Sequence, residues 1–277
     1  MILLFANQKG GSGKTTTAVA FAYHLAQLRY RVLLLDLDPQ GHGTSSSGLL
    51  PPAFAGSDTS TLADVLAGRT APQAAVTATA YGYDLIPSDE NLLAVELGQT
   101  VPTEALEKRF AYALRSLSYD YILLDSQAHL GAITKCALFS ADRVIIPVEA
   151  HPLSLLGLYQ FADNIEAIQS DPALNPRLRI AGILLTKWAA AEKICNQVLA
   201  NLDAGRLQRY LMPDRISRST DVAKASSASW AEGGGSYTGL KIPLGQPIQL
   251  FSPTCNAAKD YAFAVDDFLA KQQEARP

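Results

Sequence analysis

Short apolar runs alternate with longer amphipathic stretches along most of this chain. Several runs are continuously apolar, as expected for strands of a parallel sheet that is covered on both faces. These runs predict strands over residues 2–6, 32–36, 83–86, 121–125, 144–148 and 180–186. Apolar residues at helical spacing predict helices over residues 17–28, 103–117, 153–170, 192–202 and 257–272. Together the two patterns predict an α/β fold, with a mostly parallel twisted sheet flanked by helices.

Local signals mark the segments between these elements. Thr61 and Asp64 have the spacing of a capping box and predict a short helix. Residues 48–60 contain two prolines and predict a surface loop. Residues 226–245 are rich in Ser, Ala and Gly, and predict a flexible insertion with the form of a loop. We therefore expect a single domain over residues 1–277.

The bulk composition is that of a globular intracellular protein. The chain has 277 residues, of which 48% are hydrophobic and 18% charged, which is enough to bury a large core. Cys136, Cys195 and Cys255 lie far apart without metal-site spacing, and we expect them to be reduced in the cytoplasm. There is no charged leader followed by an apolar stretch, and no apolar run near the ~18 residues of a membrane span, so export and membrane insertion are not expected.

The first apolar run leads into a turn rich in glycine and lysine, with the sequence N-Q-K-G-G-S-G-K-T-T at residues 7–16. A strand before such a turn and a helix after it are the context of a phosphate-binding loop. Glycines let the backbone wrap around a polyphosphate, whose charge the amide groups and the helix N-terminus attract. Lys14 is expected to reach the outer phosphates, and the Thr15 hydroxyl to ligate Mg²⁺. A turn without a ligand is the alternative, but the shared register of strand, glycines, lysine and threonine disfavours it. The residues expected to bind nucleotide here are Gly10, Gly11, Ser12, Gly13, Lys14, Thr15 and Thr16.

The loop departs from the general pattern at two positions. Gln8 stands where that pattern has glycine, and a second lysine, Lys9, precedes the glycine pair. In both respects it resembles the deviant Walker A box of the ParA/MinD family of P-loop ATPases. The resemblance is closest to small ParA/Soj-type partition ATPases, which lack an N-terminal helix-turn-helix domain. It implies that Lys9 contacts the nucleotide bound by the partner subunit of an ATP-dependent homodimer.

Acidic residues follow the second predicted strand, in the segment D-L-D-P-Q-G-H-G-T at residues 36–44. Acids at the carboxyl end of a parallel strand lie beside the ligand crevice, where they can hold metal-bound water or orient an attacking water. The segment resembles the family's first switch, which implies that Asp38 is needed for hydrolysis, with Asp36 in support at the metal. His42 replaces the family's usual asparagine.

A further acid, Asp125, ends the strand over residues 121–125 and is expected to bind Mg²⁺ through water. This strand also resembles the family's. The following residues 126–129, S-Q-A-H, depart from the family's proline-containing sequence, which we expect to alter the hydrolysis rate or the coupling to a partner. We interpret His129 as a turn residue without a catalytic role.

Two weaker resemblances concern the base of the nucleotide. Lys187 ends a strand, and Pro213 stands where the family's chain passes the adenine ring. The resemblance implies contacts from both residues to the base. Ordinary chemistry at a strand end is the alternative.

The net charge of −3 conceals an uneven distribution. Residues 177–241 carry twice as many basic as acidic side chains, and a positive surface can attract the phosphate backbone of DNA. On charge alone a solvated helical surface is an equal alternative, whereas the family resemblance implies nonspecific DNA binding. The candidate DNA-binding residues are Arg206, Arg209, Arg215, Arg218 and Lys224.

The resemblance as a whole implies an ATPase that uses ATP and Mg²⁺, turns over slowly, and is stimulated by a cargo-bound, ParB-like adaptor protein. We expect it in the cytoplasm, associated with the nucleoid, where it positions or segregates a plasmid, a chromosome or another large cargo. One alternative is an ATP-dependent metabolic ligase of the same superfamily. Another is a MinD-like membrane-cycling ATPase, but residues 257–272 match a basic membrane-binding helix poorly. Scattered cysteines disfavour an iron–sulfur reductase.

Overall fold

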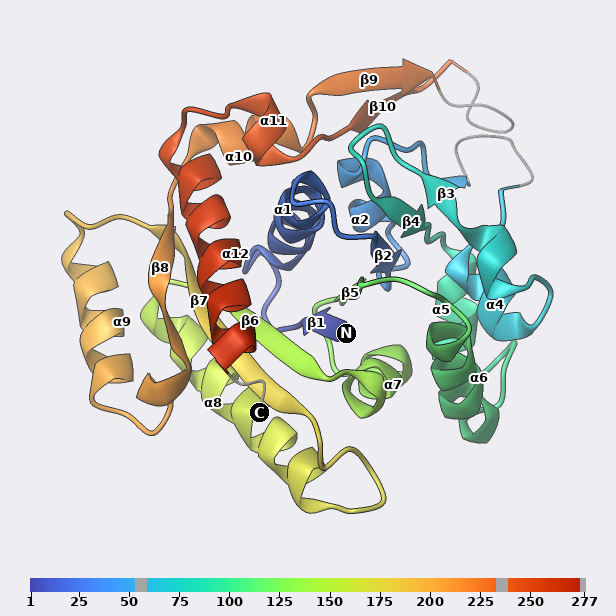
Figure 1. The fold of residues 1–277 in the computed structure, drawn as a ribbon, viewed down its shortest axis with the longest axis horizontal. Coiled ribbons are helices and arrows are strands. Elements are labelled where there is room, and N and C mark those ends of the chain that lie inside the picture. The colour runs from blue at the N-terminus through green and yellow to red at the C-terminus, as the bar shows by residue number, and fades with distance from the viewer. Residues whose placement is uncertain (53–58, 233–238, 275–277) are drawn as a thin grey trace.

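An eight-stranded sheet runs through the middle of the molecule (Figure 1). The structure, a computed structural model, describes residues 1–52, 59–232 and 239–274. The strand order is β3-β4-β2-β5-β1-β6-β7-β8, and β3 pairs antiparallel with β4 while the other neighbours are parallel. The strands are β1 Ile2–Phe5, β2 Val32–Asp36, β3 Thr77–Ala78, β4 Asp84–Ile86, β5 Tyr121–Asp125, β6 Arg143–Glu149, β7 Arg179–Trp188 and β8 Leu211–Ser217. The mostly parallel sheet expected from the sequence is confirmed.

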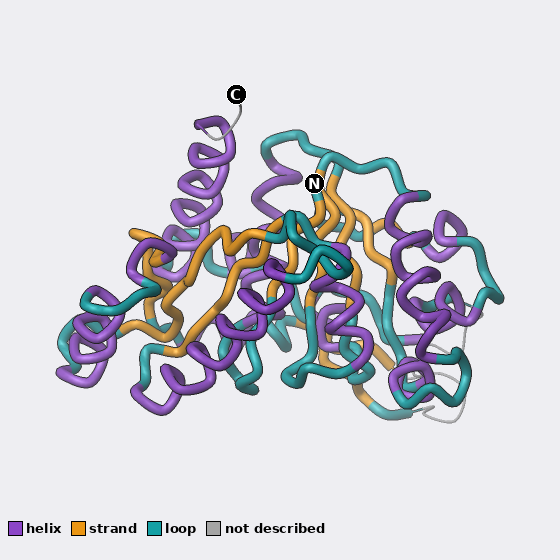
Figure 2. The backbone as a smooth tube through the Cα atoms, turned by 90° about the horizontal axis from the view of Figure 1, so that it is seen from below, coloured by secondary structure: helices purple, strands orange, loops and turns teal. Residues whose placement is uncertain are grey.

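Helices cover both faces of this sheet (Figure 2). Buried residues of α1, α10, α11 and α12 pack on one face, and those of α4 to α9 pack on the other. The α-helices are α1 Lys14–Gln27, α2 His42–Ser46, α4 Leu62–Ala67, α5 Asn91–Glu96, α6 Thr103–Arg115, α7 Ala132–Ser140, α8 Pro152–Ser170, α9 Lys193–Asp203, α10 Thr220–Ala225, α11 Ile248–Phe251 and α12 Asn256–Glu274. Two 3₁₀ helices, η1 Pro72–Ala75 and η2 Gln208–Tyr210, complete the set in the described residues. The capping box of Thr61 and Asp64 at the start of α4 is confirmed.

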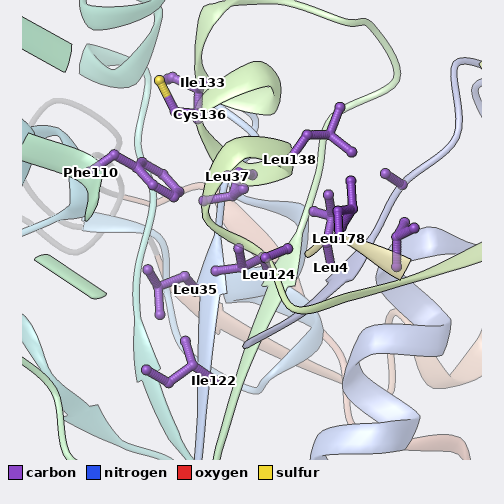
Figure 3. Close-up of a cluster of buried hydrophobic side chains, with 14 of the residues drawn as sticks. Leu4, Leu35, Leu37, Phe110, Ile122, Leu124, Ile133, Cys136, Leu138 and Leu178 are labelled. Carbon is purple, nitrogen blue, oxygen red and sulfur yellow. The ribbon is translucent and has the colours of Figure 1, made fainter. Parts of the chain in front are cut away.

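Alternation along the strands divides the core in two. In β1, Leu3 and Phe5 face the layer of α1 and α12, whereas Leu4 faces the opposite layer. Figure 3 shows part of the core on the side of Leu4, with Leu124 of β5 and Phe110 of α6. Because both faces are buried, the interior strands read as continuous apolar runs.

The C-terminal helix α12 packs against the domain, as the sequence indicated. Tyr261, Val265 and Phe268 are each at most 2% exposed, and Phe268 meets Phe21 of α1 edge to face. Within the residues that the structure describes, no helix is both long enough and apolar enough to cross a bilayer.

The expectation of a loop throughout residues 226–245 is wrong. The segment contains β9 Ser229–Glu232 and β10 Lys241–Leu244, which form an antiparallel pair separate from the main sheet. Both strands are largely exposed and have no apolar run, which is why composition suggested a loop. Residues 233–238, with the three consecutive glycines, lie outside the described residues, as do residues 53–58 of the expected loop at 48–60.

The edge strand β8 was not predicted either. Its burial is discontinuous and it contains Pro213, which a central strand would not tolerate. Residues of this unpredicted strand and of the segment after it line one end of a cavity.

Candidate functional site

The phosphate-loop candidate lies between β1 and α1, at the carboxyl edge of the sheet. Gly11 and Gly13 have φ values of 70° and 90°, which side chains with a Cβ rarely adopt. Gly13 is the N-cap of α1 and supplies no side-chain cap, so the first-turn amides remain available to an anion. From β7, the Thr186 hydroxyl donates a hydrogen bond of 2.9 Å to the carbonyl of Ser12 and supports the loop.

Lys14 lies inside this turn and is 7% exposed. Its ammonium group donates to the carbonyl oxygen of Lys9 at 3.2 Å. Burial lowers the pKa of Lys14, while the carboxylates of Asp125 and Asp38 oppose that shift. Lys14 is therefore close enough to both acids to interact with them electrostatically.

Asp36 and Asp125 are neighbours, because β2 and β5 pair with these two residues in register. Asp36 accepts hydrogen bonds from the Thr44 amide at 2.7 Å and the Thr44 hydroxyl at 2.8 Å, yet burial raises its pKa to about 6. Burial, reinforced by Asp36, raises the pKa of Asp125 well above its ordinary value, and the nearby Thr15 hydroxyl opposes this. A Cβ on Gly43 would lie 2.9 Å from the carboxyl carbon of Asp36 and 3.1 Å from an oxygen of Asp125, so only glycine fits beside the pair.

This acidic pair fits a divalent cation shared with a nucleotide. Both carboxylate oxygens of Asp125 are buried and lack a hydrogen-bond partner of normal geometry, as does the hydroxyl of Ser12. In the described residues no group of three or more His, Cys, Asp and Glu side chains is arranged to hold a metal alone. Mg²⁺ is usually held by one or two carboxylates together with water and substrate phosphates.

Asp38 lies two residues beyond Asp36, just after the end of β2. Its carboxylate accepts from the Gln40 amide at 3.0 Å, and its other oxygen is 3.1 Å from Nδ1 of His42. Burial would raise the pKa of Asp38, but the hydrogen bonds from His42 and Gln40 outweigh it and the pKa is lowered. Asp38 is thus held as an ionised acceptor, and His42 is its partner, which sequence reasoning did not foresee.

Lys9 points away from its own phosphate loop. Its ammonium group is 2.7 Å from Oε2 of Glu149 and 2.9 Å from the hydroxyl of Ser154 at the start of α8. Lys187 approaches the other oxygen of Glu149 at 3.4 Å. The hydrogen bond from Lys9 is the main reason that the pKa of Glu149 is lowered.

A cavity of about 510 Å³ joins the phosphate loop, Asp38 and the strand β8. Lys187 lines it, in agreement with its expected position, whereas Pro213 does not. The end of the cavity beyond Lys187 is instead formed by residues that follow Pro213 in β8 and α10, and by α12. These residues are Ile216, Ser217, Arg218, Ser219, Val222, Ala223, Ser226 and Tyr261. Sequence analysis named Arg218 only as a candidate DNA-binding residue and gave the other seven no role in the site, in part because it did not predict β8.

The candidate DNA-binding residues do not form one free cationic patch. Arg206 pairs with Asp163 and Glu166, Arg218 with Glu192, and Lys224 with Asp221. The remaining two lie over aromatic rings.

Those two arginines have no ion pair in the described part of the chain. Arg209 lies 4.8 Å from the ring centre of Tyr210, and Arg215 lies 5.0 Å from that of Trp188. Their charge is therefore available to another anion.

Comparisons with known proteins agree with this geometry. Residues 1–180 match the model of a family described as an AAA domain. The chain is 33% identical over 273 residues to the chromosome-partitioning ATPase Soj of Thermus thermophilus, covering 99% of this chain and 97% of the relative. It is 36% identical over 263 residues to the sporulation initiation inhibitor protein Soj of Bacillus subtilis, covering 94% of each.

Solved structures are similar over the same length. Cobyrinic acid a,c-diamide synthase from Mycobacterium smegmatis, with bound ADP and magnesium, has a TM-score of 0.76 at 27% identity, covering 99% of this chain and 96% of that one. The McdA–ATP complex of Cyanothece has a TM-score of 0.77 at 22% identity, covering 97% and 96%, and supports the fold alone.

Proposed function

The chain belongs to the ParA/Soj family of partition ATPases, and we propose that it hydrolyses ATP with Mg²⁺ as a nucleotide-dependent homodimer that binds DNA nonspecifically. In this proposal a cargo-bound, ParB-like adaptor stimulates turnover, and the protein works in the cytoplasm on the nucleoid. The cargo is a plasmid, a chromosome or another large assembly.

One observation carries the ATPase part of the proposal. The first turn of α1, the buried Lys14 and Asp38 line one cavity, and the buried carboxylate of Asp125 lies close to Lys14 and Thr15 of this lining. Amides and a lysine attract phosphate, whereas a buried carboxylate pair repels it unless a cation lies between. A nucleotide triphosphate with Mg²⁺ satisfies all of these groups together.

The residues divide the chemistry between them. When bound, Mg²⁺ supplies positive charge to the phosphate oxygens. Lys14 binds the outer phosphates and stabilises the charge that develops during transfer to water. Asp38, held ionised by His42 and Gln40, accepts a hydrogen bond from the attacking water and orients it.

The surroundings of Lys9 support a dimer. Lys9 is directed toward the start of α8, where Leu153 and Leu156 are 78% and 68% exposed. Exposed apolar side chains beside a charged group that is not used in its own site are suited to a subunit interface. We infer that ATP brings two such faces together, so that Lys9 reaches the partner subunit's nucleotide.

DNA binding rests on the family and on Arg209 and Arg215, the two candidate arginines that have no ion pair among the described residues. Arg206, Arg218 and Lys224 each have an acidic neighbour, so they contribute to a positive surface only in part. This predicts weak, salt-sensitive attraction to the DNA backbone without recognition of sequence.

The test uses the purified full-length chain with Mg²⁺ and a nonhydrolysable ATP analogue. Light scattering after size-exclusion chromatography should give a dimer, and labelled duplexes of unrelated sequence should bind with similar affinity that falls as salt rises. The ADP complex is the control and should stay monomeric. Failure to dimerise and failure to retain DNA, in protein that binds ATP, would exclude the positioning function.

A second candidate is an ATP-dependent ligase that activates a carboxylate, because the structure of cobyrinic acid a,c-diamide synthase matches nearly the whole chain at 27% identity. Such an enzyme would turn ATP over only with a small acid and an amine donor, and would be indifferent to DNA. A MinD-like membrane cycle is the third, and ATP-dependent binding to anionic liposomes would support it. The acids Asp260, Asp266 and Asp267 on α12 disfavour it.

A further inference from the structure

Glu96, the last residue of α5, places a buried carboxylate at the start of another helix. Its side chain is only 6% exposed. One oxygen accepts from the Ala132 amide at 2.5 Å, and the other from the Ile133 amide at 3.0 Å. These are first-turn amides of α7, whose own N-cap, Gly131, supplies no side-chain hydrogen bond. Glu96 therefore caps α7 from a distant part of the chain.

The same carboxylate also contacts the segment that follows Asp125. The side-chain amide of Gln127 donates to Glu96 at 3.2 Å, and Nε2 of His129 lies 3.7 Å from it. Glu96 is thus shared by two residues of this segment and by the helix after it.

Gly131 makes room for this arrangement. A Cβ built at Gly131 would lie 1.7 Å from Oε1 of Glu96, far inside any contact distance. The backbone of Gly131 has an ordinary φ of −85°, so the requirement for glycine comes from the carboxylate and not from strain. The position of the Glu96 carboxylate therefore requires glycine at residue 131.

The segment held by Glu96 borders the nucleotide cavity. Gln127 and Ala128 line it together with Lys14 and Asp38. The Cβ of Ala128 lies 4.0 Å from the point where Gly10 would carry a Cβ, so the segment lies beside the phosphate loop.

At its other end, the Ser126 hydroxyl donates to the carbonyl of Phe5 at 2.9 Å. Side-chain contacts hold the segment at both ends, and no proline stiffens residues 126–131. Its position beside the phosphate loop therefore depends on Ser126 at one end. At the other end it depends on Glu96 and on the Thr134 hydroxyl, which donates to the carbonyl of His129 at 3.1 Å.

We propose that Glu96 is a positioning residue for ATP hydrolysis, which holds Gln127 and Ala128 against the phosphate loop through its contacts with Gln127 and the start of α7. The inference rests on the proposed ATPase activity. Glu96 itself is not among the residues that line the cavity; it acts through Gln127 and Ala128, which are. Loss of the contact should slow turnover while leaving the binding of ATP, which depends on the loop and Lys14, nearly unchanged.

The test measures kcat and, separately, the Kd of ATP by calorimetry in the full-length protein. Glu96→Ala should lower kcat by about 10-fold or more, since small displacements of a catalytic arrangement have effects of that size. The Kd should stay within about twofold of wild type, a split that general loss of structure does not produce. Glu96→Gln keeps the length of the side chain and one acceptor, so its kcat should lie between those of wild type and Glu96→Ala. If the alanine variant does not fold, the glutamine variant provides the test. Glu90→Ala, an exposed acid at the start of the same helix, is the matched control.

A double-mutant cycle separates this role from a structural one. Gly131→Ala displaces the carboxylate and should lower kcat as Glu96→Ala does, but it should add little in the Glu96→Ala background. Equal effects of Gly131→Ala in both backgrounds, or wild-type kcat in folded Glu96→Ala, would overturn the inference. Absence of turnover in the wild type would instead refute the proposed function, so the two failures are distinct.

Discussion

Lys9 is bound within its own subunit by Glu149, with 2.7 Å between the ammonium nitrogen and the carboxylate oxygen. The two residues are 140 positions apart and meet where β6 ends beside the phosphate loop. Lys187 shares the same carboxylate. In the proposed dimer this ion pair must open before Lys9 can reach a nucleotide in another subunit, so we expect the pair to oppose dimerisation until ATP is bound.

The first prediction follows from this separation of the two lysines. Lys9→Ala should still bind ATP as a monomer, because Lys14 and the loop amides remain, but it should no longer form the ATP-dependent dimer. Lys14→Ala should lose nucleotide binding itself. Calorimetry for binding and light scattering for mass distinguish the two, with exposed Lys108→Ala as the control. Dimerisation of Lys9→Ala at the wild-type ATP concentration would contradict the role of Lys9.

Asp38→Ala is expected to bind ATP and to remain a dimer while hydrolysis falls by about 10²-fold or more, as for loss of a positioned base. Phosphate release and sedimentation of the ATP complex measure the two effects. His42→Asn is the companion variant, since it removes the hydrogen bond that helps to lower the pKa of Asp38 but keeps the carboxylate. It should retain most of the activity. If Asp38→Ala hydrolyses ATP normally, another group orients the water.

Asp125→Asn should stabilise the nucleotide-free protein and weaken Mg²⁺-dependent ATP binding. The folded state raises the pKa of this buried carboxyl, so wild type loses stability as pH rises from the ordinary range of a carboxyl through the folded pKa. The asparagine side chain does not ionise, so the variant does not lose stability in this way as pH rises. At about pH 8 the variant should therefore be more stable by roughly 1–3 kcal/mol, the cost of an unsatisfied buried polar group, and the gain should shrink toward about pH 5.

Denaturant unfolding in EDTA measures that stability, and ATP titrations with and without Mg²⁺ measure the binding. Glu104→Gln, at an exposed position in the first turn of α6, is the control and should show neither change. A variant less stable than wild type at the higher pH would show that Asp125 is satisfied in the free protein.

The two arginines Arg209 and Arg218 should have different effects. Arg218 lines the cavity and pairs with Glu192, so Arg218→Ala should weaken ATP binding several-fold. Arg209 lies outside the cavity, and Arg209→Ala should leave ATP binding unchanged while it lowers the salt dependence of DNA binding by about one unit of slope. Fluorescence anisotropy of a labelled duplex over a salt series measures the slope. An unchanged slope would remove Arg209 from the DNA-binding surface.

Local patterns determined much of this protein. The glycines and Lys14 after β1, the acids Asp36 and Asp125 at the ends of buried strands, and the capping box of α4 are all visible in sequence. Each depends on residues near one another in the chain, or on the rule that parallel strands end at one edge of a sheet.

Tertiary structure alone decided which distant residues meet. Glu149 forms an ion pair with Lys9, and Glu96 accepts hydrogen bonds from the start of α7. The strand β8 and the cavity wall after it were likewise hidden, because an edge strand has no continuous apolar run. Side chains 36 or 140 positions apart are brought together by strand order and helix packing, and one sequence carries no local mark of either.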